Sequence, residues 1–294
     1  MKTVVYQSFR TANVPAWIDA CMQSVRHWAD VQGFAYRFYD DRFFDLVPPA
    51  LRVRASKSKL LLADYARLVA ARDLLAEGYD RAVWMDADAF VFAPRAFEIP
   101  MTRGYAFCRE VWLDRISFGV PQFQLTVNNS VSVFCRDQQI LDFYIDTAGA
   151  ILASEEDLDP FSIGTRFLLK LRRAHRFPLL TTMGMFGPEM ALRTLANDGA
   201  FLRAYLNYQT SPVYAANLCL SLASSAAGSG AARSIDETTL AQFVRQLQAD
   251  EGQSLNRWYD GSYTPREDEF ERPLSRWIAT RQALKALTLR AQGR

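Results

Sequence analysis

The segment from 82 to 92, AVWMDADAFVF, constrains this chain more than any other. An apolar run of this length, interrupted only by Asp86 and Asp88, is typical of a strand buried on both faces. Because side chains alternate along extended backbone, the two acids are expected to point to the same side at the carboxyl end of the strand. Adjacent carboxylates repel unless a cation lies between them. A hard divalent cation, which prefers carboxylate and phosphate oxygen, is the expected ligand.

Composition excludes several classes of protein. With 294 residues, half of them hydrophobic, the chain can bury the core of one large domain. A net charge of +2 does not supply the basic surface that nucleic-acid backbones require. Four cysteines lie far apart without a CxxC pair, which favours buried thiols in a reducing compartment over a zinc site. No signal peptide or bilayer-spanning stretch is found, so we expect a cytoplasmic protein.

The first ninety residues alternate between strand and helix patterns. Strands are predicted at 3–6, 34–39 and 82–92, and helices at about 13–28 and 56–77. This alternation predicts an α/β fold whose ligands bind at the carboxyl edge of the sheet. No GxGxxG or Walker loop is present, which argues against a dinucleotide cofactor.

The second half gives shorter patterns. It predicts strands at 131–135 and 177–186 and helices at 137–149 and 161–176. The small residues at 223–233 are expected to form a loop or lid.

The segment from 272 to 294 carries six positive charges and no acid, interleaved with apolar side chains. Such a basic amphipathic helix can lie on an anionic membrane surface, here the inner face of the membrane. The alternative is a terminal helix that packs its apolar stripe on the domain.

The region from 57 to 92, KSKLLLADYARLVAARDLLAEGYDRAVWMDADAFVF, resembles the signature region of GT-A glycosyltransferases, in which an Asp–Arg helix leads into a strand ending in a DxD motif. It is most similar to retaining, metal-dependent galactosyl-, glucosyl- and mannosyltransferases. The resemblance implies a GT-A fold, a Rossmann-like mixed sheet flanked by helices in one large domain over 1–270. Its nucleotide-binding half would run to about 92 and its acceptor half from 93 to 270, followed by the basic helix at 271–294.

The resemblance also implies a chemistry for the two acids. Asp86 would contact the ribose or the metal, and Asp88 would bind Mn²⁺ or Mg²⁺ directly. The metal would bridge the diphosphate of a UDP-sugar and take up the charge of the leaving UDP. The acceptor would be a hydroxyl of a carbohydrate, a lipid-linked sugar or a protein, for example in cell-surface polysaccharide or glycolipid synthesis.

Lys57, Asp64 and Arg67 share one helix face, and the resemblance implies that Arg67 faces the diphosphate or donor sugar and Asp64 the sugar or nucleoside. A surface i, i+3 salt bridge is the alternative. Further donor contacts are expected from the loop after the first strand and from a polar pair before the strand at 131–135. These residues are Gln7, Ser8, Arg10, Asn128 and Asn129. An ordinary loop and an asparagine turn are the alternatives there.

A third metal ligand is harder to place. The histidine and glycine-lysine element near the carboxyl end of some similar families is absent from this sequence. His175 is a candidate ligand, although imidazole suits Mn²⁺ less well than carboxylate does, and Glu189 is another. His27 is expected to be structural.

Two other functions are also compatible with the sequence. A catalytically silent nucleotide- or sugar-binding protein on the same fold would fit a missing third ligand. A haloacid dehalogenase-type phosphohydrolase also carries DxD after a strand, with the first Asp as nucleophile. That motif normally opens its domain, whereas here about eighty residues precede it.

Overall fold

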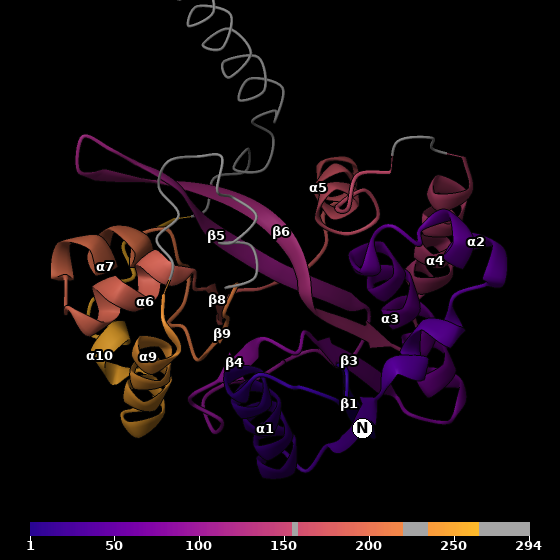
Figure 1. The fold of residues 1–294 in the computed structure, drawn as a ribbon, viewed down its shortest axis with the longest axis horizontal. Coiled ribbons are helices and arrows are strands. Elements are labelled where there is room, and N and C mark those ends of the chain that lie inside the picture. The colour runs from indigo at the N-terminus through magenta and orange to yellow at the C-terminus, as the bar shows by residue number, and fades with distance from the viewer. Residues whose placement is uncertain (155–157, 220–234, 265–294) are drawn as a thin grey trace, which may run out of the picture.

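The computed structural model describes residues 1–154, 158–219 and 235–264. Their centre is a six-stranded mixed sheet in the order β2-β1-β3-β6-β5-β7 (Figure 1). β1 is parallel to β2 and β3, whereas β6 runs antiparallel to both β3 and β5. The strands are β1 Thr3–Ser8, β2 Ala35–Tyr39, β3 Arg81–Met85, β5 Tyr105–Ser117, β6 Val120–Cys135 and β7 Leu179–Leu180. The expected class, α/β with a mixed sheet flanked by helices, is confirmed.

A three-stranded sheet in the order β4-β9-β8 stands beside the central one. It contains β4 Ala89–Val91, β9 Ala215–Asn217 and β8 Met183–Met185. The prediction of one strand over 82–92 was therefore wrong, because the chain turns at Asp86–Asp88 and passes from the central sheet to the small one. The predicted strand at 177–186 is divided in the same way between β7 and β8.

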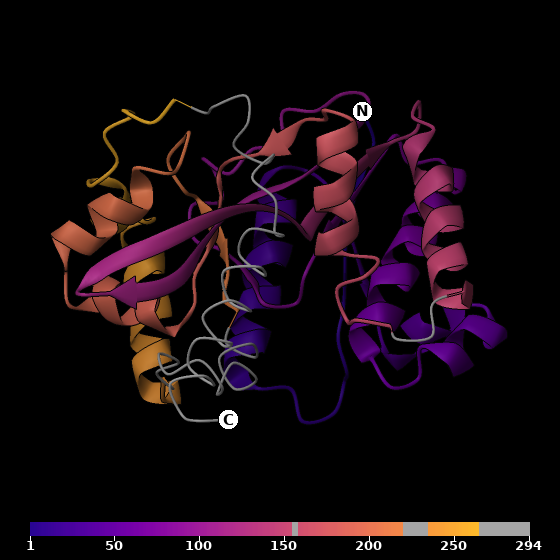
Figure 2. The same cartoon turned by 90° about the horizontal axis from the view of Figure 1, so that it is seen from above.

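The two long helices of the first half lie on opposite faces of the central sheet (Figures 1 and 2). α1 spans Ala16–Val31, later than predicted, because Pro15 is its N-cap and Gly33, at φ +68°, follows its end. α3 spans Lys59–Ala76 and begins where the Ser58 hydroxyl accepts a hydrogen bond from the Leu61 amide (3.4 Å).

The remaining helices are shorter. They are η1 Asp41–Leu46, α2 Pro49–Arg54, α4 Ile140–Ser154, α5 Thr165–Ala174, α6 Pro188–Leu195, α7 Gly199–Leu206, α9 Glu237–Ala249 and α10 Gln253–Asn256. α4 and α5 confirm the helices predicted at 137–149 and 161–176. None of the described helices is long and apolar enough to cross a lipid bilayer.

β3 shows why the sheet is buried on both faces. Ala82 and Trp84 join a core formed with α3, α4 and α5, while Val83 and Met85 join a second core formed with α1. A third core packs α6, α7 and α9 against the small sheet. The acidic turn after β3 thus lies where the two sheets meet.

Two expectations fall outside the described residues: the loop at 223–233 and the basic helix at 271–294. They stay predictions. The four cysteines are unpaired and buried, as expected: Cys21, Cys108, Cys135 and Cys219.

Candidate active site at the turn between the two sheets

Asp86 begins a tight turn and Asp88 lies within it, so the two acids do not share one face of an extended strand. The Ala89 amide donates to the Asp86 carbonyl (3.0 Å) and closes the turn. The Asp86 amide donates to the Ser130 carbonyl on β6 (2.7 Å), and the Leu218 amide donates to the Asp88 carbonyl (2.9 Å). The backbone of the motif is therefore held by both sheets.

The two carboxylates still lie close to each other, because the Asp86 charge acts on Asp88. Asn217, the last residue of β9, donates from its amide nitrogen to Asp86 Oδ2 (3.4 Å), and its hydrogen bond also lowers the pKa of Asp88. Burial and the nearby Asp86 charge outweigh that contribution and raise the pKa of Asp88 to about 7. Asp86 keeps 25% of its side chain exposed, so the acidic pair reaches solvent.

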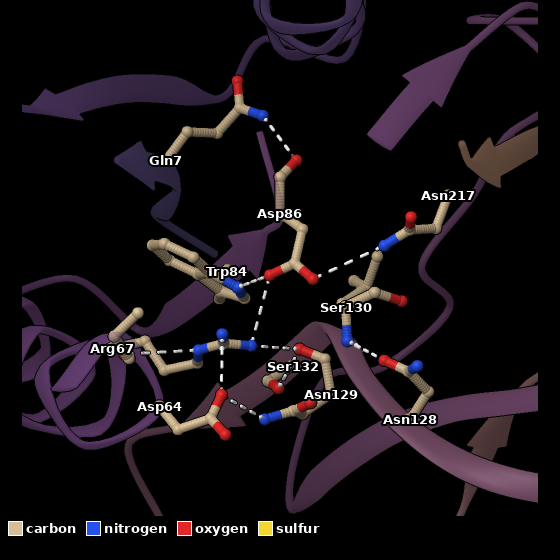
Figure 3. A network of polar contacts seen from close by, with 12 residues as sticks. Gln7, Asp64, Arg67, Trp84, Asp86, Asn128, Asn129, Ser130, Ser132 and Asn217 are labelled. Carbon is tan, nitrogen blue, oxygen red and sulfur yellow. Dashed lines mark hydrogen bonds and ion pairs between the residues drawn. The ribbon is translucent and has the colours of Figure 1, made fainter. Parts of the chain in front are cut away.

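Asp86 is oriented by its neighbours (Figure 3). Its Oδ1 accepts a hydrogen bond from Trp84 Nε1 (2.7 Å) and pairs with Arg67 (3.2 Å). Burial is the largest influence on its pKa and raises it, whereas the Arg67 charge and the Trp84 hydrogen bond lower it. Both carboxylate oxygens of Asp86 are thus engaged by the protein.

Arg67 is the centre of this network. Its guanidinium, 4% exposed, contacts Asp64 Oδ1 (2.8 Å) and Asp86 Oδ1 (3.2 Å), and also donates to the Asn129 carbonyl (2.9 Å). It also lies over the Trp84 ring, 4.8 Å from the centroid. Because these contacts occupy the guanidinium, the geometry favours a positioning role for Arg67 over the expected contact with a diphosphate or sugar.

Asp64 is enclosed in the same way. Its side chain is 5% exposed, pairs with Arg67 and accepts from Asn129 Nδ2 (3.0 Å). Burial raises its pKa to about 6, against the opposing effect of the Arg67 charge. The pair is a buried ion pair, neither the surface salt bridge weighed as an alternative nor an open sugar contact.

Asn128 and Asn129 both belong to β6, and both side-chain amides bond to protein groups. Asn129 donates to Asp64, and Asn128 donates to Glu110 Oε1 (3.1 Å) while accepting from the Ser130 amide (2.6 Å). They border the acidic turn, as expected. Their amides hold other residues in place.

Of the predicted donor-side loop, only Gln7 reaches the motif. Gln7 is fully buried, donates to the Asp86 carbonyl (3.0 Å) and accepts from the Tyr36 hydroxyl (2.9 Å). Ser8 is half-buried at the end of β1, and Arg10 is exposed and lies over the ring of the adjacent Phe9. Lys57 is exposed ahead of α3 and has no contact with the acidic turn among the described residues.

The candidates for a third metal ligand are not brought to the acids. His175 is an exposed residue at the carboxyl end of α5, and Glu189 pairs with Arg193 (2.7 Å) on α6. Among the described residues, no group of three or more His, Cys, Asp or Glu side chains is placed to hold a metal. In the part of the chain that the structure describes, a metal at the acidic turn would thus find no third ligand of these kinds.

The charges and donor atoms fit a divalent cation. Asp64, Asp86 and Asp88 supply three negative charges and Arg67 one positive charge, so the network carries a formal charge of −2. Asp88 is repelled by Asp86 and half-buried, and has no ion pair within the described residues. Mg²⁺ and Mn²⁺ commonly bind one or two carboxylates together with substrate phosphates.

Besides Trp84, which donates to Asp86, two polar residues of this network were not predicted from the sequence. Asn217 donates a hydrogen bond to the Asp86 carboxylate, and Glu110 on β5 lies buried beside Asn128. Each is a polar residue inside an apolar stretch, AANLCL and FCREVWL, and that pattern was the available signal.

No family model and no curated protein matches this sequence. Among solved structures, the chain is similar to a glycosyltransferase involved in the glycosylation of the major capsid of PBCV-1, at 7% identity and a TM-score of 0.42, with 74% of this chain and 93% of that chain covered. It is also similar to mouse xyloside xylosyltransferase 1 in its apo form, at 12% identity and a TM-score of 0.39, with 74% and 96% covered. Similarity at this level transfers neither substrates nor residue roles.

Proposed function

We propose that the protein is a metal-dependent glycosyltransferase that moves a sugar from a nucleotide-sugar donor, UDP-linked, to an acceptor hydroxyl. The observation that carries the proposal is the carboxylate pair at the carboxyl end of β3, which converges on Asn217 with an excess charge of −2. Ligands of open α/β sheets bind at this edge.

Asp86 and Asp88 would hold Mn²⁺ or Mg²⁺. When bound, the cation supplies charge stabilisation for the diphosphate as it leaves. Arg67, Trp84 and Asn217 keep the Asp86 carboxylate in one orientation, and Gln7 fixes the carbonyl of the same residue. Such a preorganised carboxylate does not need to reorganise when the donor arrives.

The phosphohydrolase alternative fits the geometry less well. It requires Asp86 as a nucleophile with a free carboxylate oxygen. Here Oδ1 pairs with Arg67 and accepts from Trp84, and Oδ2 accepts from Asn217. The silent binding protein has one observation in its favour, because the described residues supply no third metal ligand.

Donor turnover separates these possibilities. Wild-type protein is incubated with Mn²⁺ and UDP-glucose, UDP-galactose or UDP-N-acetylglucosamine, and released UDP is measured. We expect release with at least one donor, its loss on chelation with EDTA, and a loss of at least about 100-fold in Asp88→Asn. Asp30→Asn, the same change at an exposed acid on α1, is the control and should keep full turnover.

Thermal unfolding distinguishes binding from catalysis. UDP should raise the melting temperature of wild type more with Mn²⁺ than without it, and Asp88→Asn should lose that difference. Binding of UDP without turnover of any donor would favour the silent protein. Turnover of p-nitrophenyl phosphate with Mg²⁺ would favour the phosphohydrolase.

A further inference from the structure

The hairpin of β5 and β6 extends beyond the central sheet. Among the described strands, β6 pairs with β3 from Val131 to Cys135, and β5 pairs with β7 at Phe107 and Cys108. From there to their connecting turn, the two strands pair with each other alone. Figures 1 and 2 show the hairpin passing α6 and α7 and ending at the edge of the molecule. The turn is therefore presented at the end of a projection.

The apolar side chains just before the turn are packed inside the protein. The Phe123 ring contacts three aromatic rings of and after α7, with centroid distances of 5.6–6.0 Å: Phe201, Tyr205 and Tyr208. Ile116 on the other strand packs against the same third core. The base of the projection is thus fixed on α7, and the turn beyond it is held out in a defined position.

The apolar side chains at the turn itself are exposed. Phe118 is fully exposed (106%), and Val120 is 56% exposed. Neither belongs to a core, and Phe118 has no ring contact within the described residues. The stretch from 116 to 130, ISFGVPQFQLTVNNS, contains no charged residue. Such a tip can leave water without the cost of removing a charge from it.

The backbone of the turn does not account for a phenylalanine. Ser117 pairs with Val120, so Phe118 and Gly119 form a two-residue turn, with φ of +51° and +77°. Two positive φ values are typical of a type I′ turn, in which Asn-Gly is the favoured pair and a bulky first residue is disfavoured. A side chain that suits neither its turn nor a core is expected to serve a contact outside the chain.

The small size of the tip favours a lipid surface over a protein partner. A stable protein–protein interface takes about 800 Å² from each partner, whereas one aromatic side chain buries at most about 250 Å². The interface of a bilayer, in contrast, accepts single apolar side chains. Binding through so small an anchor is reversible and is strengthened by a second signal. The six positive charges in the sequence from 272 to 294, outside the described residues, would be attracted to anionic lipids.

We propose that the tip of the β5–β6 hairpin inserts Phe118 and Val120 into the interface of a lipid bilayer and thereby holds the protein on the membrane surface. This contact does not depend on the reaction at the acidic turn. It would direct the hairpin toward the bilayer and leave α4, at the opposite end of the molecule, in water (Figures 1 and 2).

Vesicle flotation of the full chain tests the contact. The vesicles are made of phosphatidylcholine with a quarter of phosphatidylglycerol, and wild type is compared with Phe118→Asn and Phe143→Asn. Phe143 on α4 is 50% exposed and carries the same change away from the tip. We expect wild type and Phe143→Asn to float equally, and Phe118→Asn to bind at least about tenfold more weakly. Because Asn-Gly suits the turn, the melting temperature of Phe118→Asn should not fall, which separates lost binding from lost folding.

A fluorescent label shows which end of the molecule meets the lipid. The four native cysteines are buried, so a cysteine introduced at an exposed position can be labelled selectively. The dye NBD is attached to Gln122→Cys, next to the tip, or to Asp142→Cys on α4, and both positions are exposed. On addition of vesicles, emission from position 122 should strengthen and move to shorter wavelength, whereas emission from position 142 should stay the same.

Three results would overturn the proposal: wild type that does not float, equal binding by wild type and Phe118→Asn, or unchanged emission from position 122. Sedimentation velocity without vesicles adds a fourth. Self-association of wild type that is lost in Phe118→Asn would assign the tip to a second copy of this chain instead of lipid. Donor turnover is measured without vesicles, so none of these results changes the outcome for the proposed function.

Discussion

At the scale of single residues, Arg67 shows how a buried charge is compensated. Its guanidinium joins Asp64 and Asp86, which come from α3 and from the turn after β3, and it lies over the indole of Trp84. Removing it would leave the buried Asp64 carboxylate and the half-buried Asp86 carboxylate without a cation. A broken buried pair costs far more than the intact pair contributes, since the remaining charge has no solvent to stabilise it.

We therefore expect Arg67→Ala to lower the free energy of unfolding by about 3–5 kcal/mol. Arg37→Ala is the matched control, because Arg37 pairs with Glu77 (2.9 Å) where the two side chains are 38% and 47% exposed, and should cost at most about 1 kcal/mol. Urea unfolding of both variants measures the difference. Equal losses in the two variants would contradict the network described here.

At the scale of elements, the site depends on how closely α5 approaches α3. Gly164 is the N-cap of α5, and a Cβ placed there would lie 2.5 Å from Asp64 Oδ2 and 3.3 Å from Asn129 Nδ2. Glycine at this position lets the start of α5 pack against the buried ion pair. A glycine is needed here because the Asp64 side chain approaches closely, and not because of a positive φ, since φ at Gly164 is −100°.

Gly164→Ala should destabilise the protein by about 1–3 kcal/mol, because the added methyl group must displace Asp64 or the start of α5. Gly187 is the N-cap of α6 and has no atom within 4 Å of the same added Cβ. Gly187→Ala changes the cap in the same way without the collision. A thermal or urea midpoint that falls equally in the two variants would show that the cap, and not the contact with Asp64, is responsible.

At the scale of the whole molecule, the buried carboxyls reverse the usual dependence of stability on pH. Burial raises the pKa of Asp64 to about 6 and the pKa values of Asp88 and Glu110 to about 7. Each folded-state pKa lies above its unfolded value, so the folded state holds more protons than the unfolded chain near neutral pH. Their contribution to stability is complete below the unfolded pKa values and is lost as the pH rises through 6 and 7.

With EDTA present, the urea midpoint of wild type should therefore rise as the pH falls from 8 to 5. In Glu110→Gln the rise should be smaller, by up to about 3 kcal/mol in unfolding free energy, since a shift of one pKa unit corresponds to 1.36 kcal/mol. Added Mn²⁺ should stabilise wild type more at pH 8 than at pH 5, since protons compete for the carboxylates. A urea midpoint that does not change with pH in the presence of EDTA, or one that is highest at pH 8, would contradict this expectation.

The local patterns of the sequence predicted the elements well and predicted one part of the site. The period of apolar residues and the caps gave the positions of α1 and α3 to within a few residues, because both signals are local to the helix. The acids of the DADA segment were identified because charge at the end of a buried strand stands out. Asp64 and Arg67 were paired correctly, since residues three apart share a helix face.

Only the tertiary structure decided what these residues contact. Asp86 is 131 positions along the chain from Asn217 and 79 from Gln7, yet it is hydrogen-bonded to both. No local pattern in the sequence shows that residues so far apart are in contact. The turn at Asp86–Asp88 exists because β4 pairs with β9 in a second sheet, which no local pattern along 82–92 could show. The packing of distant elements also decided which side chains are buried. Because Arg67 is buried, its guanidinium holds Asp64 and Asp86 in position. Because Glu110 is buried, its pKa is raised to about 7.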